Sequence, residues 1–577
     1  MRSGIAACGS GRFRFEAGPE GRVLRVLRHG LAELVRVNLE LDMEVGRLPS
    51  GGDVEAPAEG SGRTTVTTNS RCTQFVLPAI PRLDPVAVAT LNPGMLFQRK
   101  IVALALTWVF TLGLASAAPG RAIPKPTAGP NTRSLETALD RYVATPDPSY
   151  RWKTVAVTEV PGGKVASIDM TSQTWLTPAE VNRTEWKHWV TVVRPDNVQS
   201  DVGLLFITGG SNRDNQPPKP AKELLQIAAA TRSVVIELKM VPNQTLVFGN
   251  DGQERVEDDL IAYTWDKYLR TGDERWPARL PMTKAAVRAM DTVTAWTRSA
   301  EGGGKGVEKY VVAGGSKRGW TTWTTSIVDK RVVAICPIVI DVLNMEPSMI
   351  HHYQSYGFYA PAVGNYTQQG IMNWLGTPEM KALQRIEDPF FYRERLTQPK
   401  LILNACGDQF FLPDSSQFYF DRLPGEKHLR YVPNADHSLR GSDAYETLAA
   451  WQWAVVNGKR VPDFTWNRQS DGNVRVVSAQ KPKAVRLWQA NNAKTRDFRL
   501  EVIGAAWWAR SLDPEADGSY VGGISTPSAG WSAFLLELTF DIGAPVPMKL
   551  TTPVWVTPDT LPHSAPKPTL PKGFLRR

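Results

Sequence analysis

The feature that most constrains the fold is a series of short apolar segments separated by helical patterns. Between about residues 136 and 457 these segments show no regular alternation of polar and apolar residues, which is typical of strands buried on both faces. Between and after them, residues 283–299 and 445–456 repeat apolar side chains at helical spacing. The pattern predicts an α/β fold with a mostly parallel sheet covered by helices. The strand-like segments include residues 190–194, 203–207, 233–238, 309–313, 332–340 and 400–404.

The pattern changes after about residue 460. Short strand-like segments are now separated by Gly, Pro, Asp and Asn, and no long helical pattern follows. We therefore predict an all-β, sandwich-like domain over residues 458–565 and a short tail over residues 566–577. The expected strands are residues 474–477, 484–489, 498–503, 533–540 and 554–556.

Residues 95–117 contain the three parts of a secretory signal peptide in order. Arg99 and Lys100 precede an uncharged apolar run over residues 101–114, and residues 115–117 (ASA) form a small-residue cleavage site. The apolar run is shorter than the ~20 residues of a membrane-spanning helix. We expect a secreted or periplasmic protein with no stable membrane insertion after the signal is cleaved.

The 94 residues before this segment carry little pattern. We interpret residues 1–94 as a disordered leader or a mis-assigned upstream start, with translation beginning at Met95, and the Pro-rich residues 118–135 as a linker. Cleavage would leave Cys336 and Cys406, both in strand-like surroundings. They are expected to be buried thiols or a single bridge between neighbouring strands.

Composition excludes several classes of protein. The 67 Lys and Arg residues against 57 Asp and Glu give a formal charge of +10, without a run of five like charges, so no nucleic-acid partner is implied. Four cysteines in 577 residues exclude a scaffold built on disulfides. No His, Cys or Glu spacing indicates a metal site, and no cofactor is predicted.

The most informative motif is GGSKRG (residues 314–319), which follows a predicted strand and precedes a predicted helix. It resembles the nucleophile elbow of the α/β-hydrolases, where a tight turn presents a serine above the sheet. Ser316 would be the nucleophile. The second glycine comes one position later than usual, at Gly319, because Arg318 occupies the usual place. An ordinary glycine-rich turn is the alternative interpretation.

Two further residues complete a catalytic triad in the chain order of that fold. Asp408 follows the strand at residues 400–404, and His437 follows by 29 residues, which leaves room for a helix and a strand. A histidine held by a carboxylate can take the serine proton, so we expect a hydrogen bond from Ser316 Oγ to His437 Nε2. Asp341, at the end of the preceding strand, is the alternative acid.

An oxyanion hole requires two preorganised donors. The backbone N–H of Lys317 is expected to be one, and the loop that carries Gly209 and Gly210 is expected to supply the other. Arg318 is expected either to bind an anionic group of the substrate or to form a salt bridge within the scaffold.

Two other polar segments remain. His351 and His352 follow the predicted sixth strand of the sheet, where substrate binding is one role for them. The carboxylates of residues 254–259 (ERVEDD) favour a solvated helix face.

Several motifs together resemble one protein family. The segments MVPNQTLVF, EDDLIAYTW, VVAGGSKRGWTTW and NADHSL are similar to the PhoPQ-activated pathogenicity-related protein family, over about residues 135–562. The resemblance implies an exported α/β-hydrolase-like domain followed by a β domain. It names no substrate, and it links bacterial members to virulence only through the regulon in their name.

Two functions follow as hypotheses. The first is a secreted serine hydrolase that cleaves an ester or amide bond in a small-molecule, glycan or peptide substrate. The second is a secreted binding, signalling or virulence-associated protein on a hydrolase scaffold with weak or no catalysis.

Overall fold

The computed structural model describes residues 5–7, 12–17, 24–27, 136–571 and 573. The chain divides into two compact units, Met1–Ala118 and Pro119–Arg577. In the first unit the described residues form an antiparallel sheet of β1 (Ile5–Ala7), β2 (Arg12–Ala17) and β3 (Leu24–Leu27). The predicted signal peptide, the linker and most of the predicted leader lie outside the described residues, so these assignments stay predictions.

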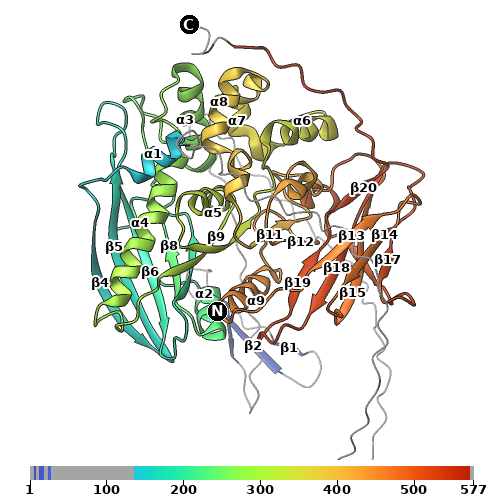
Figure 1. Cartoon of the computed structure of the whole chain (residues 1–577), viewed down its shortest axis with the longest axis horizontal. Helices are drawn as coiled ribbons and strands as arrows, with labels where there is room; N and C mark the ends of the chain where they lie inside the picture. The colour runs from blue at the N-terminus through green and yellow to red at the C-terminus, as the bar shows by residue number, and fades with distance from the viewer. Residues whose placement is uncertain (1–4, 8–11, 18–23, 28–135, 572, 574–577) are drawn as a thin grey trace, which may run out of the picture. The chain divides into compact units, whose positions relative to one another are not determined.

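The second unit is built on one mixed, 14-stranded sheet (Figure 1). Its central strands run parallel in the order β8-β7-β9-β10-β11-β12, and β6, β5 and β4 extend one side antiparallel. The prediction of a parallel sheet is thus confirmed for the centre, whereas the sheet as a whole is mixed. The bounds are β4 Arg151–Val160, β5 Gly163–Thr174, β6 Glu185–Pro195, β7 Val202–Ile207, β8 Val235–Leu238, β9 Lys309–Gly315, β10 Val332–Ile338, β11 Lys400–Ala405 and β12 Lys427–Val432.

Both faces of the central strands are buried. Successive residues of a strand point to opposite faces, and accordingly Leu205 and Val312 belong to one apolar cluster while Leu204 and Val311 belong to another. Helices α1, α4 and α5 cover the first face, and α2 and α9 cover the second (Figure 1). Their bounds are α1 Ala138–Ala144, α2 Lys222–Thr231, α4 Arg279–Arg298, α5 Lys317–Val328 and α9 Ala444–Val456. This double cover explains why the strand segments are apolar throughout.

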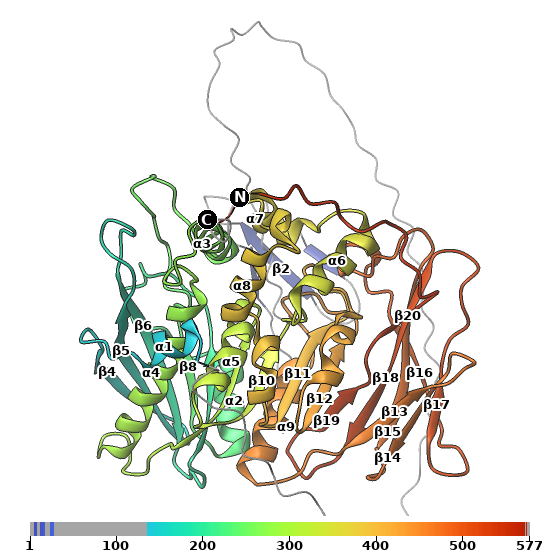
Figure 2. The same ribbon diagram turned by 45° about the horizontal axis from the view of Figure 1, so that its top comes forward.

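Four further helices lie beyond one end of the central strands, as Figure 2 shows for α3, α6, α7 and α8. Helix α3 spans Glu257–Thr271, and α6 (Met345–Tyr356), α7 (Gly364–Gln368) and α8 (Pro378–Glu387) all lie between β10 and β11 in the chain. Across the part of the chain that the structure describes, no helix is both long and apolar enough to span a bilayer.

The C-terminal part is rich in strands, as predicted, but it continues the central sheet. Strand β19 pairs antiparallel with β12 through Leu429 and Thr551, and β18, β15 and β16 follow outward. A second sheet of β13, β14 and β17 packs on the same apolar cluster as β15 and β18. The expected strand at residues 498–503 is wrong, because α10 (Leu500–Ile503) lies there. The bounds are β13 Phe464–Arg468, β14 Val474–Ser478, β15 Ala484–Asn492, β16 Trp508–Ser511, β17 Tyr520–Gly522, β18 Trp531–Phe540, β19 Met548–Thr551 and β20 Trp555–Thr557.

The two cysteines of the second unit are buried free thiols. Cys336 lies on β10 and Cys406 directly after β11. They belong to the apolar clusters on opposite faces of the sheet. The alternative of a bridge between neighbouring strands is therefore wrong, since the two side chains point apart.

Candidate active site

Ser316 occupies a strained turn between β9 and α5. Its φ of 58° and ψ of −126° are unusual for a residue with a side chain, and its N–H donates to the Ile338 carbonyl at 2.8 Å. Such strain persists only when the surroundings enforce it, and it is concentrated at functional sites. The sequence prediction of a sharp strand-to-helix turn at this serine is confirmed by the backbone.

The displaced glycine of the motif is explained by close packing beneath the turn. A Cβ on Gly319 would lie 2.8 Å from the carbonyl oxygens of Gly314 and Ile338. A Cβ on Gly314 would lie 2.9 Å from the Arg318 carbonyl oxygen. The backbone therefore approaches too closely for side chains at positions 314 and 319, while Arg318 points its own side chain away from this contact.

Substitution of Gly319 by alanine is expected to destabilise the protein. The added methyl group would contact the carbonyl oxygens of Gly314 on β9 and of Ile338 at the end of β10. The resulting strain should lower the free energy of unfolding by about 1–3 kcal/mol. Gly315→Ala is the matched control, because its nearest neighbour would be Val339 Cγ2 at 3.9 Å. Urea unfolding of both variants measures the difference, and equal stabilities would contradict the packing explanation.

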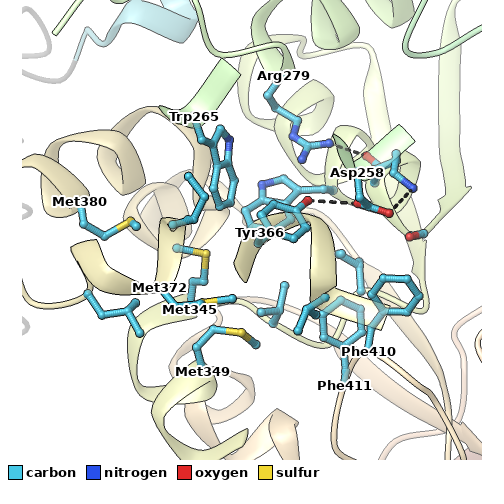
Figure 3. Close-up of a pocket in the computed structure, with 18 residues that line it drawn as sticks. Asp258, Trp265, Arg279, Met345, Met349, Tyr366, Met372, Met380, Phe410 and Phe411 are labelled. Atoms are coloured by element: carbon cyan, nitrogen blue, oxygen red, sulfur yellow. Dashed lines mark hydrogen bonds and ion pairs between the residues drawn. The ribbon is translucent and has the colours of Figure 1, made fainter. Parts of the chain in front are cut away.

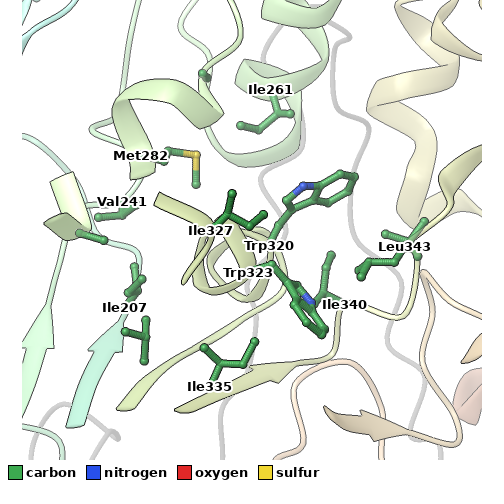
Figure 4. Packing of buried hydrophobic residues seen from close by; sticks show 14 of the residues in the cluster. Ile207, Val241, Ile261, Met282, Trp320, Trp323, Ile327, Ile335, Ile340 and Leu343 are labelled. Atoms are coloured by element: carbon green, nitrogen blue, oxygen red, sulfur yellow. The ribbon is translucent and has the colours of Figure 1, made fainter. Parts of the chain in front are cut away.

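Helix α5 is held firmly behind the serine. Figure 4 shows Trp320, Trp323 and Ile327 of this helix packed between Ile335 and Ile340 near the sheet and residues of the neighbouring helices. Trp323 is fully buried, and Trp320 Nε1 donates to the Glu387 carbonyl at 2.5 Å. Burial of large aromatic side chains contributes several kcal/mol in total, so the turn at Ser316 rests on a rigid support.

Asp408 and His437 form a close pair, as predicted. His437 Nδ1 lies 2.8 Å from Asp408 Oδ2 and 2.9 Å from Oδ1. Asp408 Oδ1 also accepts the N–H of Phe410 at 2.7 Å, and the His437 N–H donates to Gln409 Oε1 at 3.0 Å. The Phe410 ring stacks beside the imidazole at 4.3 Å between centroids. Both the carboxylate and the ring are therefore fixed in orientation.

Ser316 and His437 line one cavity but are not hydrogen-bonded to each other. The cavity also includes Thr208, Gly209 and Arg318, and its empty space is about 780 Å³ with its open mouth included. His437 Nε2 is buried and has no hydrogen-bond partner among the described residues. The expected bond from Ser316 Oγ is thus absent from the structure. The free nitrogen is the atom that a general base requires.

Asp341 does not contact the histidine. Its two carboxylate oxygens accept the hydroxyls of Tyr419 and Tyr431, each at 2.5 Å. Burial raises the pKa of Asp341 to about 7, and the two hydroxyls offset only part of this effect. The alternative that Asp341 holds His437 is therefore wrong. The structure pairs His437 with Asp408.

The expected oxyanion donors lie beside Ser316. Lys317 is the first residue of α5, so its N–H has no acceptor within the helix. Gly209 follows β7 and lines the cavity with Ser316, whereas Gly210 lies behind it against Met240. A Cβ on Gly209 would collide with the Arg318 guanidinium.

Charged groups hold the loops around the serine together. Arg318 Nε donates to the Val241 carbonyl at 2.5 Å, and Nη2 donates to Glu257 at 2.6 Å. Of its two expected roles, Arg318 therefore forms the salt bridge within the scaffold. Lys317 Nζ bridges Glu257 at 2.9 Å and Asp258 at 3.0 Å. Burial would raise the pKa of Glu257, but Arg318 and Lys317 lower it to about 2. The expected solvated helix face is wrong for Asp258, whose side chain is 16% exposed, whereas Glu257 combines these ion pairs with a side chain that is 37% exposed.

His351 and His352 do not line the cavities at Ser316. His351 Nε2 lies 3.1 Å from Asp414 within a buried cluster, and His352 Nε2 accepts the Ala360 N–H at 2.9 Å. Burial lowers the pKa of His352 to about 3. Each residue thus makes an internal contact through Nε2, and the structure gives the expectation of substrate binding no support.

Sequence reasoning missed a second cavity at Ser316. It is lined mainly by methionine, aromatic and aliphatic side chains, with about 620 Å³ of empty space including its mouth (Figure 3). Four of the twelve methionines in the chain lie on it, all within residues 345–380. That concentration was the available signal, because methionine is common on adaptable binding surfaces.

The described residues contain no group of three or more His, Cys, Asp or Glu side chains that could hold a metal ion.

Comparisons with known proteins give relatives at two levels of similarity. An acetyl xylan esterase from Thermoanaerobacterium sp. has 12% identity and a TM-score of 0.39, covering 55% of this chain and 92% of that chain. An acetyl xylan esterase from Paenibacillus sp. R4 has 13% identity and a TM-score of 0.39, covering 58% and 96%. An acylaminoacyl peptidase from Pyrococcus horikoshii has 12% identity and a TM-score of 0.33, covering 55% and 43%.

Sequence comparison is far more specific. The Autocrine proliferation repressor protein A of Dictyostelium discoideum is 37% identical over 460 residues, which cover 75% of this chain and 92% of that protein. The model of the PhoPQ-activated pathogenicity-related proteins matches residues 139–499, more than half of the chain. The chain therefore belongs to the PhoPQ-activated pathogenicity-related protein family.

Proposed function

We propose that this protein is an exported serine hydrolase of the α/β-hydrolase fold that cleaves an ester or amide bond. One observation carries the proposal: His437 is held by Asp408 at Nδ1, its Nε2 has no hydrogen-bond partner among the described residues, and His437 lines the same cavity as Ser316. Most buried polar atoms in proteins have a hydrogen-bond partner, so an unpartnered nitrogen on a histidine that is held by a carboxylate and lines a cavity supports a role as general base. The strained backbone of Ser316 supports the same role.

In the proposed reaction Ser316 Oγ attacks the carbonyl carbon, and its proton passes to His437 Nε2. The N–H groups of Lys317 and Gly209 stabilise the oxyanion. Collapse of the tetrahedral intermediate breaks the bond to the leaving group, which takes the proton from His437. Water then attacks the acyl-serine with His437 again as base, and it releases the carboxylic acid and the free serine.

The strand order supports the fold assignment. The central order β5-β6-β8-β7-β9-β10-β11-β12 places β7 between β8 and β9, and Ser316, Asp408 and His437 follow β9, β11 and β12. Ligands of open α/β sheets bind at the carboxyl ends of strands, near such a reversal of order. Export is part of the proposal because residues 95–117 carry the features of a signal peptide.

A second candidate function is a secreted binding or signalling protein on the same scaffold. The name of the 37% identical relative, a proliferation repressor, favours it, and so does the absence of a bond from Ser316 to His437. The hydrolase ranks first, because a repressor needs neither a strained serine nor an oriented histidine beside it.

Covalent labelling by a fluorophosphonate tests the proposal. We expect the purified protein to label rapidly, Ser316→Ala not to label, and His437→Ala to label slower by about 10⁴-fold or more, since the base is lost. The readout is the second-order rate constant of labelling, with circular dichroism to verify folding.

Ser478→Ala is the matched control, because Ser478 lines neither cavity at Ser316 and its hydroxyl donates to the Gln480 carbonyl. Its labelling should equal that of the parent. Folded parent protein that stays unlabelled, or labelling retained in Ser316→Ala, would reject the hydrolase and favour the binding function.

A further inference from the structure

The second cavity at Ser316 is a narrow apolar chamber. Its walls include Trp265 of α3, Trp320 of α5 and Ile340 after β10, and residues 345–380 contribute most of the rest. The residues from that segment are Met345, Met349, Val363, Tyr366, Ile371, Met372, Leu375 and Met380. Most of these side chains are almost fully buried, so the chamber is enclosed by the protein rather than spread over its surface.

The charged groups at the chamber are already neutralised by one another. Asp258 accepts from Lys317 at 3.0 Å and from the Tyr366 hydroxyl at 3.0 Å. Arg279 donates to the Lys317 carbonyl at 2.7 Å and lies 3.7 Å from Glu387. No isolated charge is therefore offered to a ligand by these groups. An uncharged apolar group would enter the chamber without a desolvation cost for polar atoms. An ionic group would lose its hydration and find no counter-charge there.

The chamber has a reactive end and a distal end. Phe410 lines the chamber, and its ring also contacts the tilted imidazole of His437, with 4.3 Å between the ring centroids. The end of the chamber at Phe410 is therefore the end near the proposed catalytic pair. Figure 3 shows Phe410, Phe411 and Asp258 on one side of the chamber and Met372 and Met380 on the other. A linear group that begins at Ser316 would therefore extend toward the methionines.

The two cavities divide the substrate at the scissile bond. His437 lines the first, wider cavity, and in acyl transfer the histidine donates its proton to the leaving group. The leaving group consequently belongs in the cavity of His437. Ser316 lines both cavities, and the narrow chamber that His437 does not line is left for the acyl group.

We propose that the narrow chamber binds the acyl group of the substrate and that this group is an uncharged, apolar chain longer than acetyl. The inference rests on the proposed hydrolase function and specifies its substrate class. Flexible methionines suit a chain of variable length, because thioether side chains repack at low cost.

A series of p-nitrophenyl esters from acetate through butyrate and hexanoate to octanoate tests the inference. We expect kcat/KM to rise roughly fourfold with each added methylene until the chamber is filled, which corresponds to about 0.8 kcal/mol per buried methylene. A flat or falling profile would overturn the inference while leaving the hydrolase intact. No hydrolysis of any ester together with no fluorophosphonate labelling would remove both proposals.

Met372→Trp locates the effect, since Met372 is half-buried at the distal side and an indole there would shorten the chamber. The ratio of hexanoate to acetate kcat/KM should fall by about tenfold or more, equivalent to about two lost methylenes. Phe391→Trp is the matched control, because Phe391 is exposed and does not line the chamber, and its ratio should equal that of the parent. Met349→Phe gives an independent reading should Met372→Trp fail to fold. An unchanged ratio in a folded chamber variant would place the acyl group elsewhere.

Discussion

Asp408→Asn should lower kcat for ester hydrolysis by about 10⁴-fold, as loss of the correct histidine tautomer does in serine hydrolases. The asparagine oxygen would keep the N–H of Phe410, which now donates to Oδ1 at 2.7 Å. Its NH₂ group would then face His437 Nδ1, where Oδ2 now lies at 2.8 Å. Nδ1 would have to accept, so the proton would move to Nε2. A protonated Nε2 cannot receive the proton of Ser316.

The matched control is Asp341→Asn, in the segment that follows the neighbouring strand β10. Asp341 is equally buried, but its oxygens accept from Tyr419 and Tyr431 and not from His437. Its kcat should stay within about threefold of the parent, as for a change that leaves the reacting groups in place. Steady-state kinetics on p-nitrophenyl hexanoate compares the two variants. A large loss in Asp341→Asn with little loss in Asp408→Asn would reverse the assignment of the acid.

The pairing of Asp408 with His437 could be predicted because chain order carries it. Each residue follows an apolar segment that can only be a buried strand, and parallel strands deliver their carboxyl ends to one edge of the sheet. The turn at Ser316 was likewise readable from its glycines, even though Gly319 is displaced. The reason for the displaced glycine could not be predicted from the sequence. It lies in the close approach of the Gly314 and Ile338 carbonyl oxygens to position 319.

Other parts of the site left no readable pattern. A run of carboxylates looks the same whether it faces water or a buried cation, so Glu257 and Asp258 could not be assigned to Lys317. The neighbouring residues His351 and His352 likewise carry no sign of their internal partners. The contacts of Lys317 and of His351 join segments far apart in the chain, and that of His352 spans eight residues through a turn that the sequence does not specify.

The C-terminal part shows the same limit at the level of the fold. The change of pattern near residue 460 correctly marks the start of a β-rich region. However, the pairing of Leu429 with Thr551 makes β19 a continuation of the central sheet, across 122 residues of chain. Local periodicity reports which face of a strand is buried but not which strand lies beside it.

A buried charge cluster ties this C-terminal part to the helices above the sheet. Arg496 lies between α6 and Asp414: its Nη2 is 2.6 Å from Asp414 Oδ2, and its Nη1 is 3.0 Å from Ser355 Oγ. His351 Nε2 completes the cluster at 3.1 Å from Asp414. The side chains of Arg496 and Asp414 are only 1% and 6% exposed. Burial would raise the pKa of Asp414, but Arg496 and His351 outweigh it and hold that pKa well below its usual range.

Arg496→Met should therefore lower the free energy of unfolding by about 3–5 kcal/mol at neutral pH, because it leaves a buried carboxylate without its main counter-charge. Arg298→Met is the matched control: Arg298 pairs with Glu308 at 2.7 Å, but the two side chains are 62% and 39% exposed. A pair so exposed contributes less than about 1 kcal/mol. Urea unfolding at several pH values measures both variants.

Since the pKa of Asp414 is depressed in the folded state, its stabilising contribution is present above the unfolded value of 3.8 and is lost as the pH falls below it. The deficit of Arg496→Met should shrink on acidification through that range. A loss no larger than that of Arg298→Met would mean that the two parts of the fold do not depend on this cluster.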